Sequence, residues 1–289
     1  MALQKFMGGS LPETVYGRIL IYGATGAGKS TLGATMPEPC AVIATEGNAS
    51  IPLGRTYADL PRVYQPPGKK DRRPYAFFVV ETWDDMREAI AEVGRLAAKG
   101  AIQSVVFDSI TAACEQIHRE VLAARKAFYA VRNRTIDVMD QQGYGLLKSN
   151  IVELRYQLHA LPLHVCWLAG DAPPRYELKG EIRALAEPGG PNLPNQAARL
   201  IPTACAAMLR LEKMEALGGE PIFRVHTQPR EEWAAKDNTG KLDAIEPPEA
   251  MLILGKMGFL TDDVFAAVRS AIPEKSPQAQ KNAELGVLD

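Results

Sequence analysis

Residues 18–31 read Arg-Ile-Leu-Ile-Tyr-Gly-Ala-Thr-Gly-Ala-Gly-Lys-Ser-Thr. An apolar stretch is followed by the spacing G-x-x-x-x-G-K-S, the pattern of a phosphate-binding loop (P-loop) between a strand and a helix. The glycines allow this loop to curl so that its backbone N–H groups converge on phosphate oxygens. The residues predicted to hold the phosphates are Gly23, Ala24, Thr25, Gly26, Ala27, Gly28, Lys29, Ser30 and Thr31.

Two side chains of this loop have predicted roles of their own. Lys29 supplies a positive charge for the β- and γ-phosphates, and the Ser30 hydroxyl is a ligand for Mg²⁺. A helix that begins near Lys29 directs the positive end of its dipole toward the same phosphates. The sequence therefore predicts binding of a nucleoside triphosphate together with Mg²⁺.

A hydrolytic site of this kind also needs one acidic group near the metal and another that activates water. Asp108 ends the apolar stretch 103–108, and Glu46 directly follows the apolar stretch 40–45. Because the carboxyl ends of parallel strands meet at one edge of a sheet, both side chains are expected beside the phosphates. We assign Asp108 to the metal and Glu46 to the water. The alternatives are an Asp that caps the next helix and an ordinary loop carboxylate.

The bulk composition gives no global sign of a nucleic-acid or membrane protein. The 289 residues include 33 basic and 34 acidic side chains, so any contact with DNA has to be a local patch. The 4 cysteines lack metal-ligand spacing and are expected to be reduced and buried. No apolar run reaches the length of a membrane span, and the first residues lack the apolar core of a secretory signal. We therefore expect a cytoplasmic protein.

Strand-like and helix-like stretches alternate along the chain, which favours an α/β fold with a mostly parallel sheet and helices on both faces. A late antiparallel hairpin is expected at one edge of the sheet. Residues 50–75 are expected to form an exposed loop, and 171–194 a loop that contains a hairpin. Gly143 and Gly145 are expected to separate two helices. The expected helices cover 29–36, 83–99, 111–138, 146–161, 248–258 and 261–271, and the late hairpin pairs 206–211 with 222–227.

Three segments, 23–31, 42–47 and 105–111, together resemble the core of RecA-type recombinases. More narrowly, the chain is similar to small phage-encoded RecA-like ATPases, some of which are Sak-type single-strand annealing proteins. This resemblance implies ATP as the nucleotide, Glu46 as the catalytic base and Asp108 with Ser109 near Mg²⁺.

The resemblance extends over 18–258 and suggests how the chain is divided. We expect an N-terminal arm at 1–16, a RecA-like ATPase core at 17–258, and a C-terminal helix with a flexible tail at 259–289.

The resemblance also points to two positions that act on the γ-phosphate. RecA proteins end the strand after the second helix with an amide that senses this phosphate. Gly170 and Asp171 occupy that place here, so either Asp171 is a substitute or the sensor is absent. By resemblance, Lys236 is a catalytic cation that reaches the ATP of a neighbouring subunit. The alternative is a surface lysine in a turn.

Residues 118–134 form a local basic patch where RecA proteins have a DNA-contacting loop. Five basic side chains accompany one acid in this stretch, and Phe128 and Tyr129 lie among them. Cations that pair with phosphates and rings that stack on bases suit single-stranded DNA. A solvated helix face is the alternative. The predicted DNA contacts are Arg119, Arg125, Lys126, Arg132 and Arg134.

The residues and the resemblance together predict a DNA-dependent ATPase that assembles on single-stranded DNA and promotes annealing or homologous recombination. A homo-oligomer, either ring or filament, is expected, with a single-strand binding protein as a further partner. If the protein is phage-encoded, it acts in the host cytoplasm. Two alternatives stay open. One is a nucleotide-switched assembly protein without DNA contact, and the other is a helicase or helicase loader on the same core.

Overall fold

The computed structural model describes residues 15–46, 76–179, 182–194, 197–215 and 221–271. The expected exposed loop at 50–75 lies outside these residues. So do most of the expected N-terminal arm and the tail beyond residue 271.

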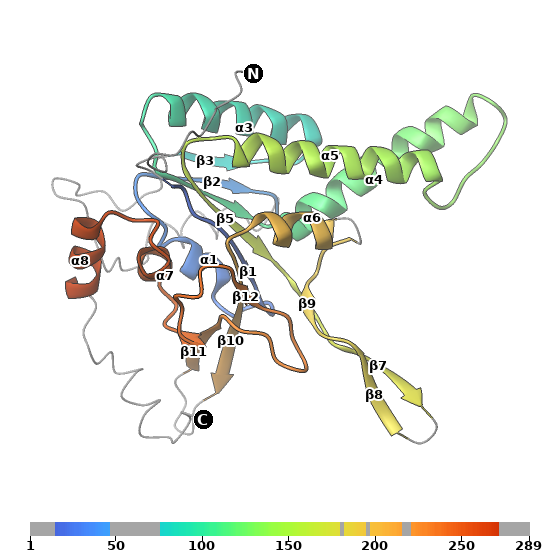
Figure 1. Cartoon of the computed structure of the whole chain (residues 1–289). Helices are drawn as coiled ribbons and strands as arrows, with labels where there is room; N and C mark the ends of the chain where they lie inside the picture. The colour runs from blue at the N-terminus through green and yellow to red at the C-terminus, as the bar shows by residue number, and fades with distance from the viewer. Residues whose placement is uncertain (1–14, 47–75, 180–181, 195–196, 216–220, 272–289) are drawn as a thin grey trace, which may run out of the picture.

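A mixed sheet forms the centre of the described part of the chain (Figure 1). Its strand order is β13-β11-β10-β1-β5-β4-β2-β3, and β12 pairs with β10. The neighbours from β10 to β3 run parallel, whereas β11, β12 and β13 pair antiparallel at one edge. The strands are β1 Arg18–Tyr22, β2 Cys40–Ala44, β3 Ala76–Val79, β4 Ser104–Asp108, β5 His164–Ala169, β10 Ala207–Glu215, β11 Pro221–His226, β12 Lys236–Asp237 and β13 Ile245–Glu246.

Helices cover both faces of this sheet (Figure 1). Helices α3, α4, α5 and α6 pack on one face, α1 and α7 pack on the other, and α8 packs against α7. Within the described ranges, no helix has both the length and the apolar character needed to cross a membrane. The helices are α1 Lys29–Gly33, α3 Trp83–Ala98, α4 Ile110–Ala130, α5 Gln141–His159, α6 Ala197–Ala204, α7 Ala250–Lys256 and α8 Asp262–Ala271.

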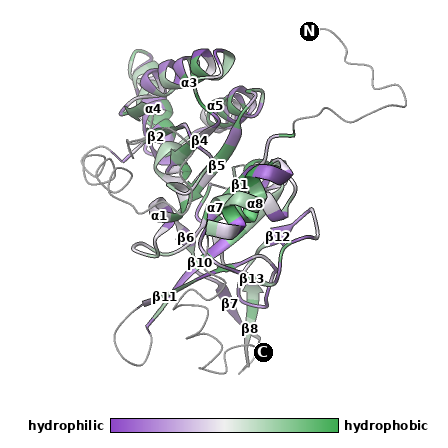
Figure 2. Ribbon diagram, turned by 90° about the vertical axis from the view of Figure 1, so that its left-hand side faces the viewer, coloured by the Kyte–Doolittle hydropathy of each residue, from purple (hydrophilic) through white to green (hydrophobic). Residues whose placement is uncertain are grey.

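The central strand β1 shows why the sequence adopts this arrangement. Leu20 and Tyr22 point into the cluster beneath α3, α4 and α5, while Ile19 and Ile21 point into the cluster beneath α1 and α7. All four are fully buried because both faces are covered, so the strand is a continuous apolar run. Figure 2 shows the same hydrophobic character at β1 and β5. The predicted α/β class, with a mostly parallel sheet and an antiparallel edge, is confirmed.

Two hairpins extend beyond the sheet on the right of Figure 1. One is the helical hairpin of α4 and α5, with the turn between the two helices at its tip. The other pairs β7 Arg175–Lys179 with β8 Ile182–Glu187, and the short pair β6 Asp171–Ala172 with β9 Gly190–Pro191 forms its base. The hairpin predicted within 171–194 is therefore confirmed.

The predicted boundary between α4 and α5 was wrong. Helix α4 ends at Ala130 rather than 138, and Gly143 and Gly145 lie inside α5 instead of breaking it. The Asp140 carboxylate accepts a 2.8 Å hydrogen bond from the Gly143 amide and caps the new helix there. A Cβ at residue 143 would lie 2.5 Å from the Met139 sulfur. A glycine is therefore needed at 143 because Met139 packs closely against it at the start of α5, and not because the helix breaks there.

Candidate nucleotide site

The loop at 23–28 connects β1 to α1 at the carboxyl edge of the sheet. Gly26 and Gly28 have φ angles of 77° and 89°, in the left-handed region that favours glycine. A Cβ on Gly23 would lie 2.3 Å from the carbonyl oxygen of Leu211 on β10. Backbone conformation and close packing therefore both require the glycines of the predicted phosphate loop.

Lys29 folds back over this loop. Its Nζ donates hydrogen bonds of 2.9 Å to the carbonyl oxygens of Gly23 and Ala24. Burial lowers the pKa of the Lys29 amine, and the nearby carboxylates of Asp108, Glu46 and Asp171 oppose that shift. The positive charge therefore lies within the field of three acidic groups, beside the loop that would hold phosphates.

The pairing of β2 with β4 brings the two predicted carboxylates together. Ala44 is the register partner of Asp108, so Glu46 lies just beyond the end of β4. The Thr45 hydroxyl donates to the Ser109 carbonyl oxygen at 2.7 Å and accepts from the Ser109 amide at 3.0 Å, which ties the two strand ends together.

Each carboxylate is held by a serine hydroxyl. Ser30 Oγ donates to Asp108 Oδ2 at 2.6 Å, and Ser109 Oγ donates to Glu46 Oε1 at 3.1 Å. Asp108 is 4% exposed, whereas Glu46 is exposed to solvent. The two acids therefore differ as their predicted roles require, since one is buried beside the loop serine and the other faces open space.

These groups line a cavity of about 650 Å³ at the carboxyl edge of the sheet. The predicted residues that the structure brings together here include the phosphate loop, Lys29, Ser30, Glu46 and Asp108. The full lining is Ala24, Thr25, Gly26, Lys29, Ser30, Glu46, Asp108, Ser109, Thr111, Ala112, Glu115, Gly170, Asp171, Pro173 and Asn192.

The donor set of this cavity fits Mg²⁺ held together with a nucleotide. Among the described residues, no cluster of three or more His, Cys, Asp or Glu side chains could hold a metal alone. Mg²⁺ is usually bound by one or two carboxylates plus phosphate oxygens, and the neighbouring oxygens of Ser30 and Asp108 match that pattern.

A family model described as an AAA domain (AAA_24) matches residues 16–239. The chain belongs to the AAA_24 family of AAA domains. This membership and the site geometry make it a P-loop ATPase. A solved structure of an ATPase from the type III secretion system of pathogenic bacteria aligns with a TM-score of 0.47 at 11% identity, covering 93% of this chain and 73% of that one. No curated protein matches the chain.

Sequence reasoning assigned no role to Thr111 and Asn192, which line this AAA_24 cavity, or to Arg210, which contacts Asp171 beside it. The Thr111 hydroxyl accepts from the Gly170 amide at 2.9 Å and donates to the Asn192 carbonyl oxygen at 2.8 Å. Arg210 lies 3.8 Å from the Asp171 carboxylate and stacks on Trp233, with its Cζ 4.4 Å from the ring centroid. The sequence offered two indications of Thr111, which lies three residues after Asp108 and ends the segment 105–111 that resembles the RecA core.

Asp171, the predicted substitute for the γ-phosphate sensor, lines the cavity at the end of β5. Burial raises the pKa of its carboxyl, while Arg210 and Lys29 oppose that shift. Arg210 also contacts Glu212 at 3.2 Å. An ion pair, rather than an amide, therefore borders the AAA_24 cavity at this position.

Lys236 does not line this cavity. It lies on β12 opposite Met208, and its Nζ donates a 2.9 Å hydrogen bond to the Cys205 carbonyl oxygen. Met208 pairs with Leu20, two residues before the end of β1. A role for Lys236 in catalysis therefore requires the nucleotide of another subunit.

The predicted DNA patch needs one correction. Arg125 is 8% exposed and forms two hydrogen bonds from Nε to the Asp140 carboxylate, at 3.0 and 3.2 Å. Its guanidinium also contacts the rings of Phe128 and Tyr129. Arg125 therefore holds α4 to the start of α5 and is not free for phosphate. The other four predicted contacts, Arg119, Lys126, Arg132 and Arg134, are exposed.

Proposed function

We propose that this AAA_24 domain hydrolyses ATP with Glu46 as the base, and that it assembles on single-stranded DNA to promote annealing. The observation that carries the hydrolytic part is the hydrogen bond from Ser109 to Glu46. It holds an exposed carboxylate on the wall of the cavity that Lys29 and Asp108 also line.

The residues of the cavity have distinct tasks in this reaction. The loop amides and Lys29 bind the phosphates, and Ser30 with Asp108 would hold Mg²⁺, which neutralises charge on the phosphate oxygens. Glu46 accepts a proton from water as the water oxygen bonds to the γ-phosphorus. The bond from that phosphorus to the β–γ bridging oxygen breaks, and ADP and phosphate are the products.

The exposed basic residues near the tip of α4 support the DNA part of the proposal. Lys126 lies on α4, while Arg132 and Arg134 lie in the turn that extends beyond the sheet (Figure 1). The Arg132 guanidinium stacks 3.7 Å from the centroid of the Phe128 ring, which is 41% exposed. Cations beside a planar surface suit a flexible strand whose bases are unpaired.

Assembly into a homo-oligomer completes the proposal. Lys236 lies away from its own cavity, which agrees with a cation that serves a neighbouring subunit. The resemblance to Sak-type annealing proteins of phages supports the same view and suggests a single-strand binding protein as a partner. Whether the assembly is a ring or a filament can be read from images taken with and without DNA.

The test is ATP turnover with and without single-stranded DNA, together with DNA affinity as a function of salt. The triple variant Lys126→Ala/Arg132→Ala/Arg134→Ala should lose DNA-stimulated turnover. Its salt slope should fall by about 2, since each lost phosphate contact contributes about 0.7. A matched control, Arg87→Ala/Arg95→Ala/Lys99→Ala, removes two exposed cations from α3 and one from the residue that follows it.

The outcomes separate the candidate functions. DNA-stimulated turnover that is lost by the triple variant Lys126→Ala/Arg132→Ala/Arg134→Ala, but kept by the control, supports the proposal. ATP turnover that is the same with and without DNA favours the nucleotide-switched assembly protein instead. Directional unwinding of a duplex would identify a helicase.

A further inference from the structure

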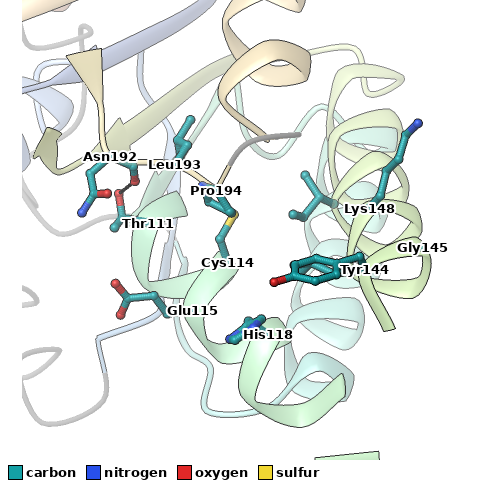
Figure 3. A pocket seen from close by; sticks show the side chains of 12 residues that line it. Thr111, Cys114, Glu115, His118, Tyr144, Gly145, Lys148, Asn192, Leu193 and Pro194 are labelled. Atoms are coloured by element: carbon teal, nitrogen blue, oxygen red, sulfur yellow. Dashed lines mark hydrogen bonds between the residues drawn. The ribbon is translucent and has the colours of Figure 1, made fainter. Parts of the chain in front are cut away.

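A second cavity, of about 640 Å³, lies between α4, α5 and the segment 192–194 (Figure 3). It borders the nucleotide cavity, because Thr111, Glu115 and Asn192 line both. Its size is within the range of small-ligand sites. The full lining is Thr111, Cys114, Glu115, His118, Tyr144, Gly145, Leu147, Lys148, Ile151, Asn192, Leu193 and Pro194.

The interior of this second cavity is apolar on one side and aromatic on another. Cys114, Leu147 and Ile151 supply buried apolar surface from α4 and α5. Tyr144, in the first turn of α5, is 57% exposed. In Figure 3 its ring extends across the cavity toward His118 on α4. A flat ligand could therefore pack on an aromatic face while its other surface meets apolar atoms.

Two exposed cations lie near this opening, and one exposed acid, Glu115, is part of its lining. Lys148 follows Tyr144 by one helical turn and is exposed, and Figure 3 shows its amine directed away from the cavity. Arg119 is exposed on α4 next to His118. Lys126 lies farther along the same helix. A ligand with an anionic chain outside and a planar group inside would match this arrangement of charge and ring.

We propose that the second cavity takes one unpaired base of a DNA single strand, stacked on Tyr144, with the flanking phosphates near Lys148 and Arg119. This inference rests on the proposed function, since it assumes that the protein binds single-stranded DNA. Stacking on an aromatic side chain accepts any base, because every base has a π face. The site is therefore one of strand binding without sequence choice.

Residues in the wall between the two cavities connect the proposed base site to the nucleotide site. Thr111 joins the first turn of α4 to Gly170 at the end of β5 and to Asn192 beside β9. A base packed against this wall restrains the same three residues that border the nucleotide. Occupation of the second cavity should therefore raise ATP turnover.

The experiment uses an oligothymidylate that carries a single 2-aminopurine, whose fluorescence falls when the base stacks on an aromatic ring. Tyr144→Ala should weaken binding roughly 5- to 150-fold, the range expected for one lost stacking contact, and should abolish quenching. Tyr144→Phe should retain both. The matched control is Tyr156→Ala, which removes a tyrosine that is 62% exposed on the same helix but does not line the cavity.

A second variant tests the cavity without removing its ring. A Cβ on Gly145 meets no atom within 4 Å, so Gly145→Leu adds an apolar side chain to the lining without a clash at Cβ. It should weaken 2-aminopurine binding and DNA-stimulated turnover while ATP turnover without DNA stays unchanged. The variant also replaces a helical glycine, so a loss of binding would not come from a weaker helix.

Each outcome bears on a different claim. If the wild-type protein binds no single-stranded DNA, the proposed function and this inference both fail. If it binds DNA but Tyr144→Ala and Gly145→Leu bind as tightly as Tyr156→Ala, only this inference fails. Loss confined to the two cavity variants, at unchanged melting temperatures, supports it.

Discussion

The Ser30 hydroxyl donates a 2.6 Å hydrogen bond to Oδ2 of Asp108, although 78 residues separate the two in the chain. This contact joins the first turn of α1 to the end of β4, across the carboxyl edge of the sheet. It places the two oxygens that are predicted to bind Mg²⁺ side by side next to the phosphate loop. The metal role of Asp108 therefore gains a geometric basis that its position at a strand end alone did not give.

We predict that Asp108→Asn lowers Mg²⁺-dependent ATP turnover by about 100-fold or more, because a buried anion that balances the metal is lost. The measurement is turnover across a Mg²⁺ titration. Asp84→Asn on the exposed face of α3 serves as the control. Turnover by the Asp108 variant within a few-fold of wild type would remove Asp108 from the metal site.

Glu46→Gln should bind ATP normally but turn it over about 100-fold more slowly, because an amide cannot accept the proton of the attacking water. Ser109→Ala removes the hydrogen bond that orients this carboxylate, so it should slow turnover to a smaller extent. In the Glu46→Gln background, Ser109→Ala should have no further effect on turnover. A full additional loss would mean that Ser109 acts independently of Glu46.

The local part of the site was predictable because one short stretch contains a strand, a glycine loop and a helix start. The roles of Lys29 and Ser30 could be assigned from their spacing to the glycines alone. Thr111 and Asn192 could not be found in this way, since their contact joins residues 81 apart. Only the folded sheet brings them to the same cavity.

Arg125 shows a second limit of sequence reasoning. Charge counting treated it as one of five equivalent cations, but tertiary packing pairs it with Asp140, 15 residues later. The same aspartate caps α5, so the error over Arg125 and the wrong break at Gly143 have one cause. A capping residue just before an apolar helical pattern was the signal available in the sequence.

We expect Arg125→Ala to lower the melting temperature by several degrees, because Asp140 then loses its main partner. Lys126→Ala, at the exposed neighbouring position, should leave it unchanged. Arg125 and other donors hold the pKa of the Asp140 carboxyl below its usual range. This stabilisation is present above the ordinary pKa of aspartate and is lost as pH falls below it. Equal melting temperatures at pH 7 for the two variants would contradict the structural role of Arg125.

For Glu249 the expected pH dependence of stability is the opposite of that for Asp140. It directly precedes α7, is 7% exposed, and burial raises the pKa of its carboxyl to about 7. Between the ordinary pKa of glutamate and 7, the folded state binds more protons than the unfolded state, so the free energy of unfolding falls as pH rises. The shift corresponds to about 3 kcal/mol once the pH exceeds 7.

Glu249→Gln should therefore be more stable than wild type at pH 8, because a neutral amide avoids the burial of a charge. Near pH 5 the two proteins should differ little, since Glu249 is then protonated in the folded state. Urea unfolding at pH 5, 6.5 and 8 measures this difference, and Glu88→Gln on the exposed face of α3 is the matched control. A gap between Glu249→Gln and wild type that stays constant with pH would show that the carboxyl does not titrate in this range.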